Sequence, residues 1–437
     1  MITRICLCLV LFAAIPAMSQ VAPGATGPPA DDQMRTPPPV SGEAYPTATG
    51  SETRSNYLGA GLSVNTAYND NVFTGGSTKP TGDEVYAIAS SFSLDQTTSR
   101  THRTFTYSPG FTFYEHTNAL NAMNQNATVG FQYRLSPHLM FSLRDSFVQS
   151  SNVFDQPYGG ISGSTQSPTE SVVAPFASQR NDAASGIVSY QFAGNAMIGG
   201  GGTFAINNYT NSAQTTGLSN SKSGGGSAFY NRRLSAAQYI GVTYQYSNMR
   251  ANSMNEQSKT ETQTINSFYS VYLKHILSLS VSGGPQHVND AESTLAASDS
   301  WKPSITASVG WQTSRVSCAV SYSRTVSGAG GLLGTFKSTS AGASARWQLA
   351  RTWTVGSTFS YTNNTSVNPL SVSASQGGRT LSGTVLLQRA LGEHFAAEAG
   401  YSRLNQSYPD ISSISAAPNI DREYISVSYK LRRPLGR

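Results

Sequence analysis

The chain has 437 residues, of which 12% are charged and 10% are aromatic, and its formal net charge is +6. A soluble globular protein carries about twice this share of charged residues, and no basic stretch interleaved with aromatic residues indicates a nucleic-acid partner. After the N-terminal apolar stretch, no run of about 18 apolar residues predicts a transmembrane helix. The composition therefore favours a membrane protein built of strands, in which only every second residue faces lipid.

Residues 1–19 are typical of a cleaved signal peptide. Arg4 supplies a positive charge, an apolar run follows, and the small residues Ala17 and Ser19 precede the predicted cut. Residues 20–56 are rich in Pro, Gly, Ala and Thr and bury too little apolar surface to fold, so we expect a disordered periplasmic lead.

Residues 57–437 alternate apolar with polar side chains, which is the period of a strand with one face in lipid. In the first segment, Leu62 and Val64 share one face, and Ser63 and Asn65 share the other. Such segments predict an all-β fold, a transmembrane antiparallel up-and-down β-barrel of about 18 strands (16–18). The expected ranges are 58–68, 84–95, 103–114, 125–135, 138–149, 184–193, 195–208, 223–233, 237–248, 262–274, 276–284, 302–312, 314–325, 336–348, 351–362, 378–389, 393–404 and 423–431.

The connections between these segments alternate in length. Those after even-numbered segments are short, as at 136–138, and those after odd-numbered segments are long and polar, as at 150–183. Short periplasmic turns and long outer loops are the outer-membrane arrangement, so we expect both chain ends in the periplasm. Aromatic residues near segment ends predict two girdles at the level of the lipid headgroups. They are Trp301, Trp311, Trp347, Trp353, Phe113, Tyr246, Tyr361 and Tyr401.

The end of the first segment resembles a known family. The sequence Tyr-Asn-Asp-Asn-Val-Phe, with Tyr68, Asp70, Asn71 and Phe73, is similar to a signature of β-barrel porin 2 type outer-membrane proteins. Residues 107–114, in which a Pro-Gly pair is flanked by aromatic residues, resemble an early strand of the same family. The resemblance implies a large outer-membrane barrel and a role in exopolysaccharide export.

Few residues form a pattern suited to catalysis or metal binding. Asn69, Asp70 and Asn71 offer oxygen ligands, but a calcium loop needs spaced acidic residues and a terminal Glu, so Asx-type capping of the loop is favoured. The glycines at 199–202 lack the Lys and the helix of a phosphate loop and indicate a bent or closely packed strand. An outer-membrane phospholipase needs a Ser and a His that face lipid, and no local motif pairs His116 with a Ser. We expect no enzyme activity, no metal and no cofactor, and we expect Cys318 to act as a small apolar side chain.

The polar face of the predicted strands lines the lumen. Hydroxyl and amide side chains dominate it, and because these groups donate and accept hydrogen bonds, such a wall suits water and neutral polar solutes. The inward charges expected near the middle of strands are Arg144 and Glu398. Those expected near the periplasmic ends are Arg134, Arg233, Arg346 and Lys430. These cations form either a solvated rim or a patch that draws anions to the periplasmic mouth.

The sequence thus predicts a channel of the bacterial outer membrane that passes polar solutes, or serves polysaccharide export, through a Ser/Thr-lined lumen. The alternative is a structural or adhesive barrel with a closed lumen and ligand-binding outer loops. A barrel of about 18 strands favours the channel, because it leaves an aqueous lumen unless loops fill it. Expected partners are outer-membrane lipid and lipopolysaccharide, the barrel assembly machinery, and a small polar solute or polysaccharide. Nucleic acid is not expected.

Overall fold

The computed structural model describes most of the predicted barrel. The described residues are 56–72, 81–150, 178–193, 195–210, 218–252, 257–273, 276–292, 298–313, 315–328, 332–367, 377–408 and 419–435. The predicted signal peptide, nearly all of the predicted lead, and Phe73 of the family motif lie outside these residues.

The described residues form 18 β-strands and one short 3₁₀ helix. Their bounds are β1 (Tyr57–Asn69), β2 (Asp83–Thr97), β3 (Thr101–Tyr114), η1 (Asn118–Leu120), β4 (Ala122–Arg134), β5 (Leu139–Ser150), β6 (Ser178–Ala193), β7 (Ala196–Thr210), β8 (Asn220–Ser235), β9 (Gln238–Asn252), β10 (Gln257–Leu273), β11 (Leu277–Glu292), β12 (Ser298–Gln312), β13 (Val316–Gly328), β14 (Thr335–Gln348), β15 (Trp353–Ser366), β16 (Gly377–Ala390), β17 (Phe395–Ser407) and β18 (Asn419–Pro434).

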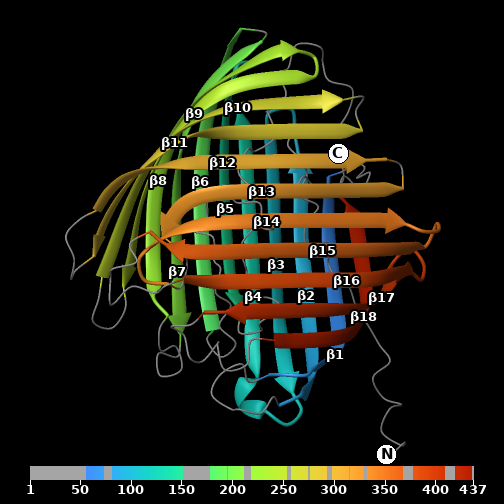
Figure 1. Cartoon of the computed structure of the whole chain (residues 1–437). Helices are drawn as coiled ribbons and strands as arrows, with labels where there is room; N and C mark the ends of the chain where they lie inside the picture. Colours follow the sequence, from blue (N-terminus) through green and yellow to red (C-terminus); the bar gives the residue numbers. More distant parts are fainter. Residues whose placement is uncertain are drawn as a thin grey trace, which may run out of the picture.

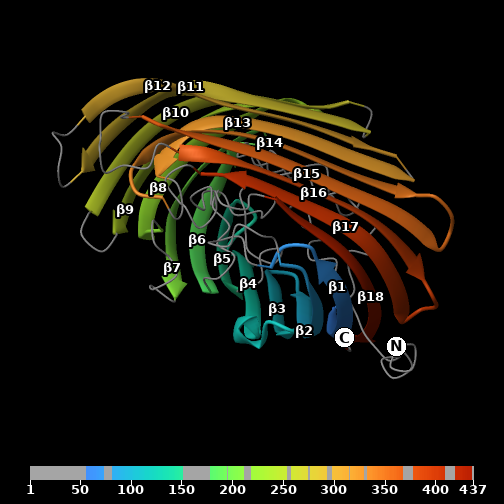
Figure 2. The ribbon, with the colours of Figure 1, turned by 60° about the horizontal axis from the view of Figure 1, so that its bottom comes forward.

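Each strand pairs with its neighbours in the chain, and the last strand returns to the first (Figures 1 and 2). β1 and β18 are antiparallel over the whole length of β1, from Tyr57 opposite Pro434 to Asn69 opposite Arg422. The sheet therefore closes into an 18-stranded antiparallel barrel, and the predicted fold is confirmed. Closure matters because a sheet edge in lipid would leave backbone groups without hydrogen-bond partners.

Several strands are longer than their apolar alternation predicts. β6 begins at Ser178 where 184 was expected, β11 ends at Glu292 where 284 was expected, and β18 begins at Asn419 where 423 was expected. The alternation reports only the part of a strand that faces lipid. Beyond that part the backbone ladder continues with polar side chains, which have no period to detect.

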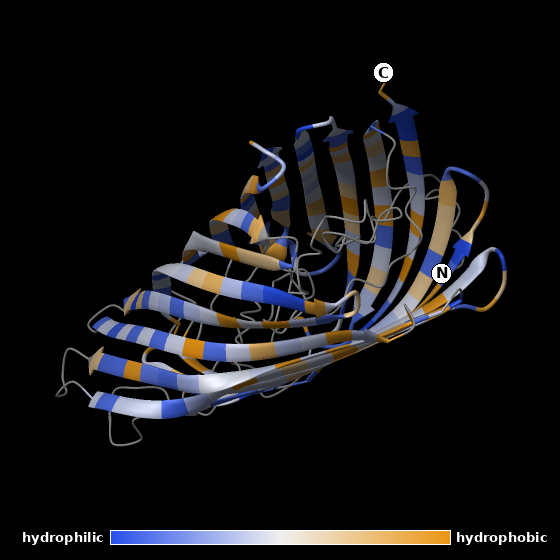
Figure 3. Ribbon diagram, turned by 90° about the horizontal axis from the view of Figure 1, so that it is seen from above, coloured by the Kyte–Doolittle hydropathy of each residue, from blue (hydrophilic) through white to orange (hydrophobic). Residues whose placement is uncertain are grey.

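The two faces of the wall differ in exposure and polarity. Large apolar side chains such as Leu143, Val320 and Phe359 are exposed on the outer face, whereas Ser360 and Ser382 are buried on the inner face. Figure 3 shows hydrophilic and hydrophobic residues alternating along the strands. An apolar outer face on a closed barrel is the surface of a bacterial outer-membrane protein that crosses the bilayer many times.

Three girdle tryptophans are exposed on this outer face. Trp301 lies near the outer end of β12, Trp311 near the periplasmic end of β12, and Trp347 near the periplasmic end of β14. Among the described residues, no helix has the length and the apolar character needed to cross a bilayer.

Candidate functional site: the lumen

The two charges predicted near mid-strand lie on the inner face but far from each other. Arg144 on β5 lies opposite Gly130 and Ser185, and its neighbour Leu143 is exposed on the outer face. Glu398 on β17 lies opposite Ser426 and accepts a hydrogen bond of 2.9 Å from the Tyr424 hydroxyl. β18, β1, β2, β3 and β4 lie between β17 and β5 in the wall. The structure therefore does not bring Arg144 and Glu398 together.

Charged groups gather instead near the periplasmic end of β18. Lys430 interacts electrostatically with Arg432 on the same strand, with Arg346 on β14 and with Glu398 on β17. Lys430, Arg346 and Glu398 were predicted from the sequence as lumen charges, but Arg432 was not, because the predicted strand ends at 431. In the structure β18 continues to Pro434, and the alternation places Arg432 on the face of Lys430.

The charged groups continue around the wall to β3. The Arg432 guanidinium stacks over the Tyr57 ring of β1, 5.2 Å from the ring centre. Asp95 of β2 lies 3.2 Å from the Nε2 atom of His102 on β3. Asp95 and His102 were not predicted as lumen charges, although each alternates with outward-facing neighbours in the sequence. We call Arg346, Glu398, Lys430, Arg432, Asp95 and His102 the charge belt.

The two remaining rim cations, Arg134 and Arg233, lie near the ends of β4 and β8 and outside the charge belt. Arg134 ends β4, and its backbone N–H donates to the Arg100 carbonyl at 2.8 Å. Arg233 lies near the end of β8, and its backbone N–H donates to the Asn195 carbonyl at 2.7 Å.

An apolar patch occupies the inner wall on the other side of the barrel. Met197 of β7, Tyr239 of β9 and Phe268 of β10 are buried together, and Phe229 and Tyr272 pack against them. β9 is as far from β18 as the ring of strands allows, so this patch and the charge belt lie on opposite walls near the periplasmic end. The inner face is therefore not uniformly hydroxyl-lined. Inward aromatic residues also explain why apolar residues fall on both faces of segment 262–274.

The outer ends of β13 and β14 bend into the outer half of the lumen. The backbone N–H of Val326 on β13 donates to the Gln286 side-chain oxygen at 2.8 Å, and the Gln286 amide donates back to the Val326 carbonyl at 2.7 Å. Gln286 belongs to β11, which is not adjacent to β13 in the sheet. At the start of β14, the Thr335 hydroxyl donates to Asp290 of β11 and also contacts the Thr260 hydroxyl of β10, each at 2.6 Å. The outer ends of β13 and β14 therefore lie inside the barrel, against β10 and β11.

Apolar contacts hold the same piece of chain. Leu332 is completely buried with Phe336 and Tyr408. Leu333 packs against Met249 and Ala251 on the inner face of β9. We call the described residues within 325–338 the inner hairpin. It reaches from its own strands to the wall at β9, so it narrows the lumen in the outer half.

Asp70 and Asn71 of the Tyr-Asn-Asp-Asn-Val-Phe sequence lie at the seam between β1 and β18, the first and last strands. The Asp70 carboxylate accepts the backbone N–H of Asp421 at 2.7 Å, and the Asp70 backbone N–H donates to the Asp421 carbonyl at 3.1 Å. The Asn71 side chain donates to the Asn419 carbonyl at 3.1 Å. Tyr68 is exposed on the outer face. These contacts join the end of β1 to the start of β18 across the seam and are not the local Asx-type capping expected from the sequence.

His116 also takes part in a structural contact. Its Nδ1 atom lies 2.9 Å from the buried Asp83 carboxylate, and this hydrogen bond raises the pKa of His116 above its usual value. Asp83 also accepts the backbone N–H groups of His116 and Thr117, so it caps the loop that follows β3.

Comparisons with known proteins give no family. No family model matches the chain, so the resemblance to β-barrel porin 2 type proteins stays a prediction. No curated protein matches either. Among solved structures, the chain is similar to the Pseudomonas aeruginosa outer membrane protein OpdK, with 10% identity, coverage of 86% of this chain and 99% of that one, and a TM-score of 0.43. It is also similar to Pseudomonas aeruginosa OpdO, with 10% identity, coverage of 86% and 97%, and a TM-score of 0.41. The ferric citrate transporter FecA matches with 12% identity, coverage of 82% and 61%, and a TM-score of 0.41.

Proposed function

We propose that the barrel is an outer-membrane channel for small polar solutes that prefers organic anions. The inner wall carries hydroxyl groups in cross-strand pairs. The part-buried pairs, Ser323 with Ser340 and Thr384 with Ser402, leave lone pairs and protons for passing water and solutes. The pairs Ser270 with Ser280 and Ser360 with Ser382 are buried.

The charge belt is the observation on which the anion preference rests. Arg346, Arg432 and Glu398 each lie within electrostatic reach of Lys430. The belt thus holds three cations with the carboxylates Glu398 and Asp95. A lumen with low-dielectric walls focuses the field of such groups, so the local concentration of anions rises. The apolar patch on the opposite wall favours anions that also carry an apolar body.

The inner hairpin bears on the size of the solute. Its contacts with Gln286 and Met249 place backbone and apolar side chains across the outer half of the lumen. Small solutes fit such a narrowed path better than an extended polysaccharide does. Polysaccharide export would require this piece of chain to leave its contacts.

The same contacts support the second candidate, a barrel whose lumen stays closed and which acts through its outer loops. Leu332 and Leu333 are buried among residues of several strands. If they seal the outer half, water does not pass. Apart from the loop between β3 and β4, which contains η1, the tips of the outer loops lie outside the described residues.

Single-channel recording separates the two candidates. The purified barrel is placed in a planar lipid bilayer under a KCl gradient, and the reversal potential is measured. We expect discrete conductance with weak anion preference, and a mild dependence on salt because ions screen the charge belt. The variants Lys430→Glu and Arg346→Glu should each move the reversal potential toward cation selectivity.

Arg433→Glu is the matched control, because Arg433 is exposed opposite the outward residue Leu58. It should leave the reversal potential unchanged. A conducting barrel that prefers cations would contradict the proposed anion preference. A folded barrel with no conductance would replace the channel with the closed barrel.

A further inference from the structure

The ladder between β12 and β13 is incomplete. Its outermost pair is Ile305 opposite Arg324, although β12 begins at Ser298 and β13 continues to Gly328. Every other pair of neighbouring strands shares a longer stretch of contact. Within the described residues, β12 and β13 therefore have no backbone ladder along the outer half of their seam.

The outer end of β13 is ordered but lies elsewhere. It stays paired with β14, from Thr325 opposite Ser338 to Gly328 opposite Thr335. Its Val326 backbone bonds to the Gln286 side chain of β11. Figures 1 and 2 show β13 curving away from β12 at this end. The edge of β12 from 298 to 304 therefore faces a lateral opening with the inner hairpin behind it.

The opening lies at the level of the outer leaflet. Trp311 near the periplasmic end of β12 and Trp301 near its outer end are both exposed on the outer face. At a rise of about 3.3 Å per residue and a tilt of about 40°, the two indoles are roughly 25 Å apart across the membrane, the height of the apolar band. The free edge begins at Ser304 and reaches Trp301, so it lies in the outer part of this band.

Two prolines suit the opening. Pro303 on β12 lies opposite Pro285 on β11. A proline has no N–H for the ladder, so it is tolerated where a strand has a free edge. On the other side of β11, the ladder with β10 is interrupted between Thr264 opposite Gln286 and Ser267 opposite Gly283. Pro303 and Pro285 therefore lack a backbone N–H donor at positions where the ladder to β13 and the ladder to β10, respectively, are absent.

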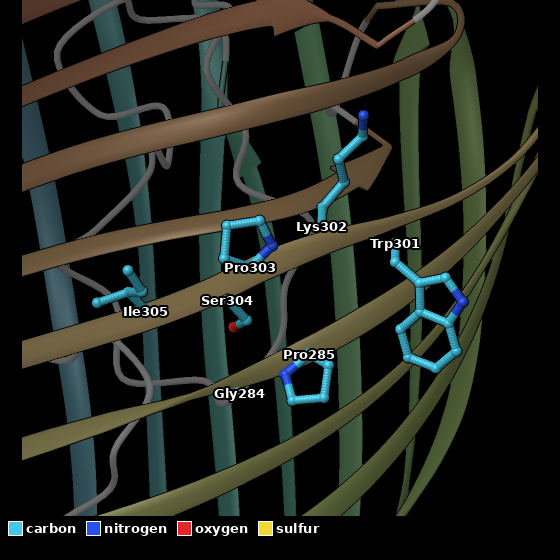
Figure 4. A pocket seen from close by; sticks show the side chains of 7 residues that line it. All are labelled: Gly284, Pro285, Trp301, Lys302, Pro303, Ser304 and Ile305. Atoms are coloured by element: carbon cyan, nitrogen blue, oxygen red, sulfur yellow. The ribbon is translucent and has the colours of Figure 1, made fainter.

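A shallow, open depression lined by residues of β11 and β12 lies beside this edge (Figure 4). Its lining includes the apolar side chains of Trp301, Pro303, Ile305 and Pro285, together with Lys302. In Figure 4 the Lys302 side chain extends from β12 away from Pro285, toward the side of the missing ladder. Trp301, Pro303 and Ile305 share the exposed outer face of β12. Lys302 alternates with them and lies on the inner face of β12, so its ammonium group is on the lumen side of the free edge.

We propose that the β12–β13 seam is a lateral doorway for an anionic amphiphile, a single acyl chain with a carboxylate headgroup. The acyl chain lies against Trp301 and Pro303, and the carboxylate pairs with the Lys302 ammonium. The molecule moves between the outer leaflet and the lumen without crossing the outer mouth of the barrel. An edge that opens onto lipid is otherwise costly, and a bound amphiphile covers it. This role is separate from ion conduction through the lumen.

Photolabelling tests the doorway. The purified full-length barrel is reconstituted in phospholipid vesicles with palmitate that bears a diazirine on its acyl chain, and labelled peptides are found by mass spectrometry. We expect label on the peptides around Trp301 and Pro285, and loss of that label when plain palmitate is in excess. Lys302→Glu should abolish it. Lys222→Glu, a change of an exposed lysine near the outer end of β8, should not.

The second test introduces a disulfide that closes the seam between β12 and β13. If the ladder continued, Ser304 would lie opposite Thr325, so Ser304→Cys with Thr325→Cys is built in a Cys318→Ser background. Labelling at the edge should be lost after oxidation and return after reduction, while ion conductance is unchanged. Label spread evenly over the outer wall, or edge label that survives Lys302→Glu, overturns the doorway. Conductance measured in the same preparations reports separately on the channel.

Discussion

Adjacent residues on β5 allow the inside and the outside of the wall to be tested with one introduced side chain. Leu143 is 46% exposed on the outer face, and Ser142 beside it lies on the inner face opposite Gln132. Leu143 is the fifth residue of β5, which begins at the periplasmic turn. At about 2.5 Å of height per residue of a tilted strand, it lies roughly 10 Å into a band of about 25 Å, near the middle of the membrane.

Leu143→Arg places a guanidinium in the hydrocarbon region, at a cost of about 2–4 kcal/mol at that depth. This cost corresponds to a loss of roughly 30- to 900-fold in the folding equilibrium. Ser142→Arg adds the same side chain to an aqueous wall and should cost less than about 1 kcal/mol. Arg144→Glu, also on the inner face, should insert normally and move selectivity toward cations.

Folding into phospholipid vesicles is measured by a guanidinium titration followed by tryptophan fluorescence. Heat-dependent migration in a gel serves as an independent check of the folded barrel. The reasoning fails if Ser142→Arg destabilises the barrel as much as Leu143→Arg does. It fails equally if Leu143→Arg folds like the wild type.

Three further outcomes are expected. Gln286→Ala leaves the buried N–H and carbonyl of Val326 without partners, at about 1–3 kcal/mol for each group, so the inner hairpin should loosen and single-channel conductance should rise. Gln245→Ala on β9 is the control, and equal conductance in the two variants would argue against a narrowing hairpin. Asp70→Ala removes the hydrogen bond to Asp421 and should lower the guanidinium midpoint of unfolding by an amount that added Ca²⁺ does not restore; restoration would indicate a metal site instead. For His116, an NMR titration should give a pKa above the usual 6.5, so the contact with Asp83 is complete below pH 6.5 and is lost as pH rises through the raised value. An ordinary pKa would show that the hydrogen bond does not form.

The sequence alone determined the wall of this protein. Alternation of period two follows directly from the geometry of a strand between lipid and water, so strand number, pairing partners and the outward girdles could be predicted. The same alternation assigned Lys430 and Arg346 to the inner face. The alternation left Arg432 outside the predicted segment 423–431, because the apolar pattern ends before the backbone ladder of β18 does.

Only the tertiary structure decided what lies within and across that wall. Alternation states on which face a side chain lies, but it contains no information on which distant strands face each other across the lumen. The interaction of Lys430 with Arg346, and the apolar patch opposite them, depend on closure of the ring. The departure of β13 from β12 is likewise invisible, because its side chains keep their period while its backbone bonds to Gln286 rather than to the next strand. Non-local hydrogen bonds of this kind leave no periodic trace in a single sequence.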